Sequence, residues 1–272
     1  MKKVLFFSLL ACVALFFGCK QKPKANTFTV GFDAEFPPYG FKDTKTGEYI
    51  GFDLDLAAEV CKRNGWTLVK KPIDWAAKDT ELNAGTIDCI WNGFTRSAER
   101  EDKYSWTVPY VKNQQLVMVR KDSGITKLEQ LNGKGVVAQD GSTGADAIKD
   151  FLKSTQEKNK DFAFRELKLV PDYNSAAMML RSKAVDAIAL DGAIAGKIAE
   201  QGKGEFVLLS EALCDDLYAV GFKRGNNELR DTVEKTLKEM VKDGTAAAIV
   251  KRWAIEQKDN DGAKINFILT AE

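Results

Sequence analysis

Hydrophobic positions in the first part of the chain predict alternating strands and helices. Phe28 to Phe32 alternates hydrophobic and polar residues, as a strand does. Phe52, Leu56 and Val60 fall at helical spacing, and Gly65 follows where that helix should end. The expected elements in order are a strand at 28–32, a helix at 53–63, a strand at 66–69, a helix at 77–84 and a strand at 87–90. This order is typical of a parallel sheet with helices on its faces.

A second series of the same kind begins near residue 116. Its expected elements are strands at 116–119, 135–139 and 187–190, a glycine-rich turn at 140–144, and helices at 145–153 and 174–181. One stretch repeats an earlier one in spacing: Leu82, Gly85, Ile87, Asp88 and Ile90 are matched by Leu180, Lys183, Val185, Asp186 and Ile188. Both copies predict a helix, a tight turn and a buried strand. We therefore expect two lobes, with ligand-binding groups at the carboxyl ends of these strands.

The last part of the chain returns to the first lobe. A strand is expected at 217–222, a helix from Asn227 and a final helix from Thr245. Extended segments at 110–117 and 210–218 would join the lobes as a hinge. Two lobes on a hinge can close around a ligand.

The composition excludes several classes of function. The 40 lysines and arginines stand against 39 acidic residues, so there is no basic footprint for nucleic acid. Histidine is absent, which excludes Ser-His-Asp and Cys-His catalysis and the commonest zinc and copper ligand sets. Cys61, Cys89 and Cys214 lack metal-binding spacing, and we expect small buried hydrophobic residues rather than a disulfide pair. No cofactor is expected.

The N-terminus has the features of an export signal. Two lysines precede a hydrophobic run at 4–17, which is too short for the roughly 20 residues of a bilayer span. The following Gly-Cys pair is similar to a bacterial lipoprotein cleavage site. We expect a signal peptide over 1–18, then a lipidated Cys19 and a flexible tether over 19–27. Two bulky phenylalanines before the site depart from the lipoprotein pattern, and signal cleavage without lipidation is the alternative.

The segment from Asp88 to Arg100 combines the features of an anion-binding site. Its buried strand ends in a polar turn, where Gly93 lets the backbone approach a ligand and Thr95 offers a hydroxyl. Ser97 is expected as a helix N-cap, which would place Arg100 beside free backbone N–H groups. A guanidinium holds a carboxylate through two parallel hydrogen bonds, each worth about 1.5–3 kcal/mol. The alternative is an exposed surface arginine.

Six segments in order resemble the polar amino-acid branch of the solute-binding proteins of ABC importers, the binders of glutamine, histidine and lysine/arginine/ornithine. They are VGFDAEFPPYGF, GEYIGFDLDLAAEVCKR, LNAGTIDCIWNGFTRSAER, VVAQDGSTG, AVDAIALD and DGTAAAIVKRW. The resemblance implies an α/β, two-lobed periplasmic-binding-protein-like fold of type II, with two hinge crossings and a ligand cleft between the lobes. Lobe 1 is then expected at 28–112 plus 217–262, lobe 2 at 113–216 and a C-terminal tail at 263–272.

The resemblance also implies roles for individual residues. Arg100 would bind the α-carboxylate of the ligand with help from Thr95. The turn of the second lobe would add Ser142, Thr143 and Gly144. Asp191 would accept hydrogen bonds from the α-ammonium group, with the carbonyl of Gly93 as a further acceptor. Since cation and anion then come from different lobes, only the closed state satisfies both, and binding favours closure.

The side chain of the ligand would lie between aromatic rings. Phe36 and Trp75 match positions whose rings sandwich it in relatives, with core packing as the alternative for each. Asp33 matches a position that contacts the distal end of the side chain in some relatives, although an aspartate can equally cap its own turn. Asn92 is a further candidate for selecting the side chain, and Trp91 is expected in the core. Acidic residues near the cleft favour a basic ligand, whereas Asn92 suits a neutral amide or cystine.

We therefore expect a receptor that captures a polar or basic L-amino acid by lobe closure and delivers it to an ABC permease in the inner membrane. It would act as a monomer in the periplasm or cell envelope, held to a membrane by its lipid anchor. The alternative is an enzyme on the same scaffold, since cyclohexadienyl dehydratases resemble this family.

Overall fold

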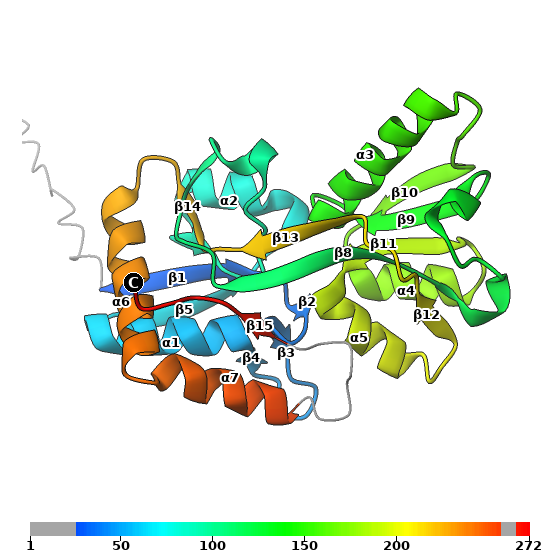
Figure 1. The fold of residues 1–272 in the computed structure, drawn as a ribbon. Helices are drawn as coiled ribbons and strands as arrows, with labels where there is room; N and C mark the ends of the chain where they lie inside the picture. The colour runs from blue at the N-terminus through cyan, green and yellow to red at the C-terminus, as the bar shows by residue number, and fades with distance from the viewer. Residues whose placement is uncertain (1–25, 257–264) are drawn as a thin grey trace, which may run out of the picture.

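The computed structural model describes residues 26–256 and 265–272 and contains two α/β lobes joined by long strands (Figure 1). The α/β class predicted from the sequence is confirmed. The expected signal peptide and lipidated Cys19 lie outside the described residues.

Lobe 1 is built on a five-stranded sheet. From edge to edge its strands are β5 (Thr67–Pro72), β1 (Thr27–Phe32), β6 (Cys89–Ile90), β14 (Gly221–Lys223) and β7 (Tyr104–Trp106). β1 is parallel to both of its neighbours, whereas β14 is antiparallel to β6 and β7. Its helices are α1 (Phe52–Asn64), α2 (Lys78–Ala84), α6 (Asn227–Lys242) and α7 (Thr245–Glu256), with 3₁₀ helices η1 (Trp75–Ala77) and η2 (Ala98–Arg100). A small antiparallel sheet is added by β2 (Glu35–Phe36), β3 (Gly40–Lys42) and β4 (Tyr49–Ile50).

Lobe 2 is built on a second sheet. Its strands in order are β10 (Glu166–Val170), β9 (Gly135–Gln139), β11 (Ala187–Asp191), β8 (Val111–Arg120) and β12 (Phe206–Leu208). The helices are α3 (Thr143–Lys158), α4 (Tyr173–Arg181) and α5 (Gly192–Gln201), with 3₁₀ helices η3 (Lys121–Ser123) and η4 (Leu128–Leu131). β10 was missed by the sequence pattern because none of its side chains is fully buried at this sheet edge and their exposure does not alternate.

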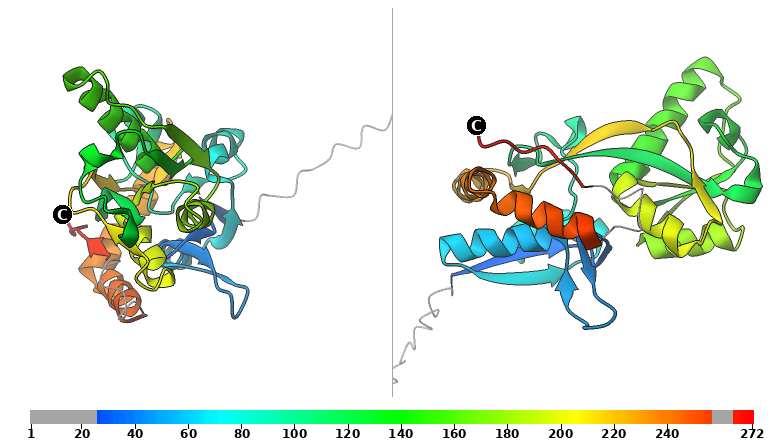
Figure 2. Two further views of the ribbon diagram at one scale, coloured as in Figure 1. Left: turned by 90° about the vertical axis from the view of Figure 1, so that its right-hand side faces the viewer. Right: turned by 60° about the horizontal axis from the view of Figure 1, so that its bottom comes forward.

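Two antiparallel strands connect the lobes, as expected for the hinge. β8 leaves lobe 1, and β13 (Cys214–Tyr218) returns to it in register with Val111–Gln115 (Figure 2, right). A short strand near the C-terminus, β15 (Asn266–Phe267), also pairs with β8 (Figure 1). Three stretches of chain therefore meet at the crossing.

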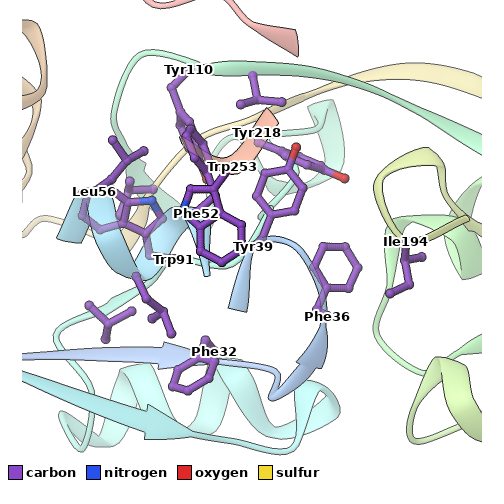
Figure 3. Packing of buried hydrophobic residues seen from close by; sticks show 14 of the residues in the cluster. Phe32, Phe36, Tyr39, Phe52, Leu56, Trp91, Tyr110, Ile194, Tyr218 and Trp253 are labelled. Carbon is purple, nitrogen blue, oxygen red and sulfur yellow. The ribbon is translucent and has the colours of Figure 1, made fainter. Parts of the chain in front are cut away.

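The core of lobe 1 is rich in aromatic rings that extend toward the second lobe. Trp91 has no exposed surface, so its expected core position is confirmed. The ring of Phe52 packs edge-on against Tyr39, with centroids 5.9 Å apart, and nearly parallel to Tyr110 at 6.5 Å. Figure 3 shows Phe36 between this cluster and the α5 residue Ile194 of lobe 2. The floor of the interlobe space is thus continuous with the core.

Three local predictions were wrong. The strand expected at 217–222 is divided, because β13 ends at Tyr218 in the crossing and β14 begins at Gly221 in the lobe 1 sheet. The expected turn at 140–144 is shorter, since Ser142 already caps α3 by accepting a hydrogen bond from the backbone N–H of Ala145 at 3.0 Å. The helix expected after Ser97 is a single 3₁₀ turn, and the Ser97 side chain does not cap it.

The three cysteines in the described residues are free thiols. Cys61 and Cys89 are buried and Cys214 is half-buried. The predicted absence of a disulfide among them is confirmed.

Candidate functional site

The residues singled out by the sequence converge on the space between the lobes. It is lined by Asp33, Phe36, Trp75, Asn92, Gly93, Thr95, Arg100, Gln139, Ser142, Thr143 and Asp191. The enclosed volume is about 10 Å³, because side chains of the two lobes contact one another directly. Gln139 was not anticipated. Gly144 does not line the space: a Cβ there would lie 3.0 Å from the backbone oxygen of Ala189, so this glycine permits close packing of α3 on β11.

Arg100 reaches from lobe 1 to lobe 2. Its side chain is only 9% exposed. One terminal nitrogen donates to Thr143 Oγ1 at 2.9 Å, and the other donates to the backbone oxygen of Gly141 at 3.2 Å and to Asp146 Oδ2 at 3.3 Å. The alternative of a surface arginine is therefore excluded. The α-helix N-terminus expected beside Arg100 is absent, since η2 has three residues, and the guanidinium lies 5.4 Å from the ring centroid of Phe94.

Asp191 ends β11 on the opposite side of the space. Its Oδ1 accepts hydrogen bonds from Gln115 Nε2 and the Tyr218 hydroxyl, both at 2.7 Å, and from Asn113 Nδ2 at 2.9 Å. Oδ2 accepts one, from the Tyr173 hydroxyl at 3.1 Å. Burial raises the pKa of Asp191, although these donors oppose the rise. Oδ2, with a single partner, has the spare capacity to accept from a further donor.

Three of the four donors to Asp191 come from the crossing strands. Asn113 and Gln115 lie on β8, and Tyr218 is the last residue of β13. Sequence reasoning missed them because they are distant from Asp191 in the chain and lie in segments that the pattern marks only as extended. The strands of the hinge therefore hydrogen-bond directly to a residue of the site.

A second carboxylate lies next to Asp191. Asp216 Oδ2 accepts hydrogen bonds from Thr95 Oγ1 at 2.9 Å and from Gln115 Nε2 at 2.7 Å, while its buried Oδ1 has no partner. Burial, together with the charge of Asp191, raises the pKa of Asp216 to about 6. The two acids therefore create a negative end of the cleft.

Asp33 forms a third acidic position, at some remove in the loop that follows β1. Its Oδ1 accepts from the backbone N–H of Glu35 at 2.8 Å, so it does cap its own turn. Its Oδ2 accepts from Gln139 Nε2 of lobe 2 at 2.6 Å, and Asn92 Oδ1 accepts from the Asp33 backbone N–H at 3.0 Å. Burial raises the pKa of Asp33. Asn92 and Gln139 thus hold this carboxylate in the cleft wall.

Aromatic residues form the remaining wall. Phe36 is buried between Tyr39 and Tyr173, with ring centroids 6.0 and 6.1 Å away. Trp75 is buried edge-on against Phe94 at 5.6 Å. Both rings border the interlobe space, so packing and ligand contact are compatible for them.

Gly93 occupies a position that no other residue would fit. Its φ is +55°, and a Cβ would lie 2.8 Å from the ring of Phe36 and 3.0 Å from that of Tyr218. Its backbone N–H donates to the fully buried Asp53 at 2.6 Å, and Asp53 also accepts from the Tyr110 hydroxyl at 2.8 Å. The backbone that lines the cleft is therefore fixed from below by a buried carboxyl group.

The charges of the cleft are unbalanced. Within residues 26–256 and 265–272, no lysine or arginine forms an ion pair with Asp33, Asp191 or Asp216. The same residues contain no cluster of three His, Cys, Asp or Glu side chains that could hold a metal ion. Buried carboxyl groups of this kind either retain a proton, as their raised pKa values favour, or gain a cationic partner. An organic cation that also carries a carboxylate for Arg100 would complete the site.

Comparison with known proteins agrees with this geometry. Residues 28–256 match the model of the bacterial extracellular solute-binding proteins, family 3, and the chain belongs to that family. It is 26% identical to the L-cystine-binding protein TcyJ of Escherichia coli over 84% of this chain and 82% of that protein. Among solved structures it resembles a substrate-binding protein of an ABC uptake transporter from Streptococcus pneumoniae with bound histidine, at 32% identity and a TM-score of 0.76, over 84% and 92% of the two chains.

A third relative binds cationic amino acids. The arginine-, lysine-, histidine-binding protein ArtJ from Geobacillus stearothermophilus is 26% identical, with a TM-score of 0.73 over 84% of this chain and 94% of that one. The predicted family and the two-lobed fold are confirmed. Among the residues that the structure describes, there is no helix with the length and hydrophobicity of a membrane span.

Proposed function

We propose that this protein is the substrate-binding component of an ABC importer and that its ligand is a cationic L-amino acid such as arginine, lysine or histidine. Arg100 binds the α-carboxylate, and Asp191 accepts from the α-ammonium group through Oδ2. Asp33 and the aromatic rings of Phe36 and Trp75 receive the side chain. The observation that carries the proposal is the set of buried carboxylates without a cationic partner.

Charge balance favours a basic side chain over a neutral one. Asp33, Asp191 and the neighbouring Asp216 contribute up to three negative charges, against the positive charges of Arg100 and of the buried Lys78 next to Trp75. A basic amino acid brings two cationic groups and one carboxylate, which leaves the smallest net charge in the closed cleft. A neutral amide such as glutamine would leave Asp33 with Gln139 as its partner, and cystine would need more room.

Closure follows from the division of the site between lobes. Arg100 lies on lobe 1 and Asp191 on lobe 2, so a zwitterion bridges them only when the lobes are together. A ligand shifts a conformational equilibrium by its differential affinity for the two states. The closed form is then the form that a permease would recognise.

A thermal-shift screen against the common amino acids and cystine tests the ligand assignment. A ligand at 100 times its Kd stabilises the protein by about 2.7 kcal/mol, which is readily seen as a shift in Tm. We expect arginine, lysine or histidine to give the largest shift. A larger shift with glutamine or cystine would contradict the cationic assignment.

Asp33→Asn separates charge from shape at the distal end of the cleft. We expect it to weaken binding of the cationic ligand roughly 10-fold or more, since a charge-assisted hydrogen bond is worth about 1.5–3 kcal/mol. Binding of glutamine, if any, should change little. The matched control is Asp43→Asn, which removes the same charge from a half-buried position outside the cleft, where Asp43 also caps its own turn. Equal losses in both variants would indicate a general electrostatic effect.

An enzyme on the same scaffold is the competing proposal. The relatives named above are binding proteins, which favours binding without turnover. Incubation of the purified protein with prephenate tests the dehydratase alternative. Formation of phenylpyruvate above the blank would contradict a purely binding role.

We also propose that the protein acts outside the cytoplasmic membrane, anchored by a lipid on Cys19. Membership of an extracellular family supports export. Labelled palmitate should be incorporated into the wild-type protein and not into Cys19→Ala, which should be released from membranes. Equal labelling of both would locate the lipid elsewhere.

A further inference from the structure

The C-terminal strand β15 lies outside the region matched by the family model, yet it joins the hinge. The model match ends at residue 256, whereas β15 covers Asn266–Phe267. Asn266 pairs with Lys112 and Phe267 with Val111, in antiparallel register. The backbone N–H of Ile268 then donates to the oxygen of Tyr110 at 2.9 Å. In Figure 1, β15 runs alongside the lobe 1 end of β8.

Side chains fix this strand to lobe 1. The ring of Phe267 meets that of Phe52 edge-on with centroids 6.2 Å apart, and Leu269 is buried. Phe52 stacks in turn on Tyr110, whose hydroxyl bonds Asp53 beneath the cleft. β15 therefore holds residues 110–112 as part of lobe 1.

The two edges of β8 pair with different strands. β13 occupies one edge along Val111–Gln115, so β15 must lie on the other. That other edge is taken by β11 from Gln115 onward. Between β15 and β11, Asn113 and Gln114 have no strand partner on this edge among residues 26–256 and 265–272. A cavity of about 720 Å³, lined in part by Asn113, Gln114, Gly192 and Asn266, lies there.

The gap lies at the residues that hold the carboxylate of Asp191, which is proposed to bind the ammonium group of the ligand. Asn113 Nδ2 and, at the end of the gap, Gln115 Nε2 donate to Asp191. A rotation at this gap would move lobe 2 relative to lobe 1 while the strand pairs on both sides stay intact. Asn113 and Gln114 pair with β13 on one edge only, whereas their neighbours Lys112 and Gln115 are paired on both edges. Because backbone hydrogen bonds in a strand pair resist bending, these two residues resist changes of φ and ψ less than their neighbours do.

We propose that β15 is a third hinge strand that positions the pivot: it immobilises the lobe 1 end of β8 and confines lobe rotation to Asn113 and Gln114, next to Asp191. Without it, the pivot spreads over Tyr110–Gln114, and open conformations become more populated. The effect on ligand affinity rests on the proposed function, since apparent affinity falls with the fraction of protein in the binding-competent form.

Ile268→Pro in the full-length chain tests this inference. Proline removes the N–H that Tyr110 accepts from, without touching the cleft. Ala271→Pro is the matched control, because residue 271 is exposed and lies beyond the strand. Fluorophores on Lys62→Cys in lobe 1 and Lys160→Cys in lobe 2, in a Cys214→Ser background, report the interlobe distance by energy transfer.

We expect Ile268→Pro to broaden the distribution of interlobe distances toward longer values. It should also lower the affinity for the amino acid that gives the largest thermal shift by roughly 3- to 10-fold. The ratio of affinities for different amino acids should stay the same, since no contact in the cleft is changed. The control should match wild type in both measurements.

A lower Tm with unchanged distances and unchanged affinity would overturn the proposal and leave β15 as a static attachment. The distance measurement needs no ligand. It therefore tests the hinge strand even if no amino acid binds, which would refute the proposed function alone.

Discussion

The two lobes contain the same arrangement of helix, turn and buried strand, but the residues that follow or end this strand carry opposite charges. In each lobe a helix is followed by a residue with left-handed backbone, Gly85 at φ +72° and Lys183 at φ +64°, and then by a buried strand. An aspartate directly precedes each strand and accepts from a backbone N–H of the neighbouring strand. Asp88 Oδ2 lies 2.7 Å from the Thr29 nitrogen, and Asp186 Oδ2 lies 2.8 Å from that of Gly135.

Beyond these strands the lobes diverge. In lobe 1 the strand β6 leads through Gly93 to the cation Arg100, whereas in lobe 2 the strand β11 ends on the anion Asp191. The comparison teaches that the common scaffold determines where a ligand lies, and the few residues after each strand determine which charge it meets.

Removal of the lobe 1 cation should have the largest effect. Arg100→Ala is expected to weaken amino-acid binding more than 100-fold, because loss of one member of a buried charged pair costs about 2–5 kcal/mol. Calorimetry measures the loss. Arg96→Ala is the matched control, since Arg96 is in the same loop but pairs with Glu101 outside the cleft. Equal affinity of wild type and Arg100→Ala would contradict the proposal that Arg100 binds the α-carboxylate of the ligand.

Removal of the lobe 2 anion should have the next largest effect. Asp191→Asn keeps the shape but loses the charge that attracts the ammonium group, and we expect a loss of about 2 kcal/mol, or roughly 30-fold in Kd. Asp215→Asn is the control, because Asp215 is exposed and accepts from Gln114 outside the cleft. A loss confined to the control would place the ammonium site elsewhere.

The buried acid beneath the lobe 1 turn should govern part of the pH dependence of stability. Burial raises the pKa of Asp53 from 3.8 to about 7 in the folded protein. The folded state thus keeps a proton that the unfolded chain releases above about pH 4. This contribution is complete below that pH and is lost as the pH rises to about 7, so the free energy of unfolding should fall over this window.

Urea denaturation at a series of pH values compares wild type with Asp53→Asn. The difference between their unfolding free energies should change between pH 4 and 7 and then level off. Asp55→Asn, at a half-buried position of the same helix where Asp55 accepts from Arg252, retains Asp53 and should keep the wild-type slope. Parallel curves for wild type and Asp53→Asn would contradict the buried-acid assignment.

The smallest effect concerns the paired left-handed turns. Gly85→Ala should destabilise the protein by about 1 kcal/mol, since a left-handed backbone costs a residue with a Cβ about 1–2 kcal/mol. No atom lies within 4 Å of the added methyl group, so the cost is conformational alone. Chemical denaturation measures this loss of unfolding free energy. Ala84→Gly, at the last residue of the preceding helix, makes the reverse substitution for comparison. A loss above 3 kcal/mol would reveal a packing role.

The sequence predicted the elements whose periodicity is strong. β9 matches its expected range at 135–139, and α6 and α7 begin at Asn227 and Thr245 as expected. Asp33, Arg100 and Asp191, which the family resemblance implied as ligand-binding residues, all line one space.

Other features could not be predicted from local pattern. Tyr218, Asn113 and Gln115 contact Asp191 only because two crossing strands pair, and extended segments carry no signal of their partners. Gln139 ends a buried strand, and its meeting with Asp33 depends on how far the lobes close. The docking of β15 on β8 likewise depends on an edge that only the assembled hinge presents.

A crystal structure of the protein with the amino acid that stabilises it most would test the central claim directly. The account predicts the ligand between the lobes, with its carboxylate within hydrogen-bond distance of the Arg100 guanidinium and its ammonium group on Asp191. A ligand bound through other residues, with Arg100 and Asp191 both remote from it, would contradict the account.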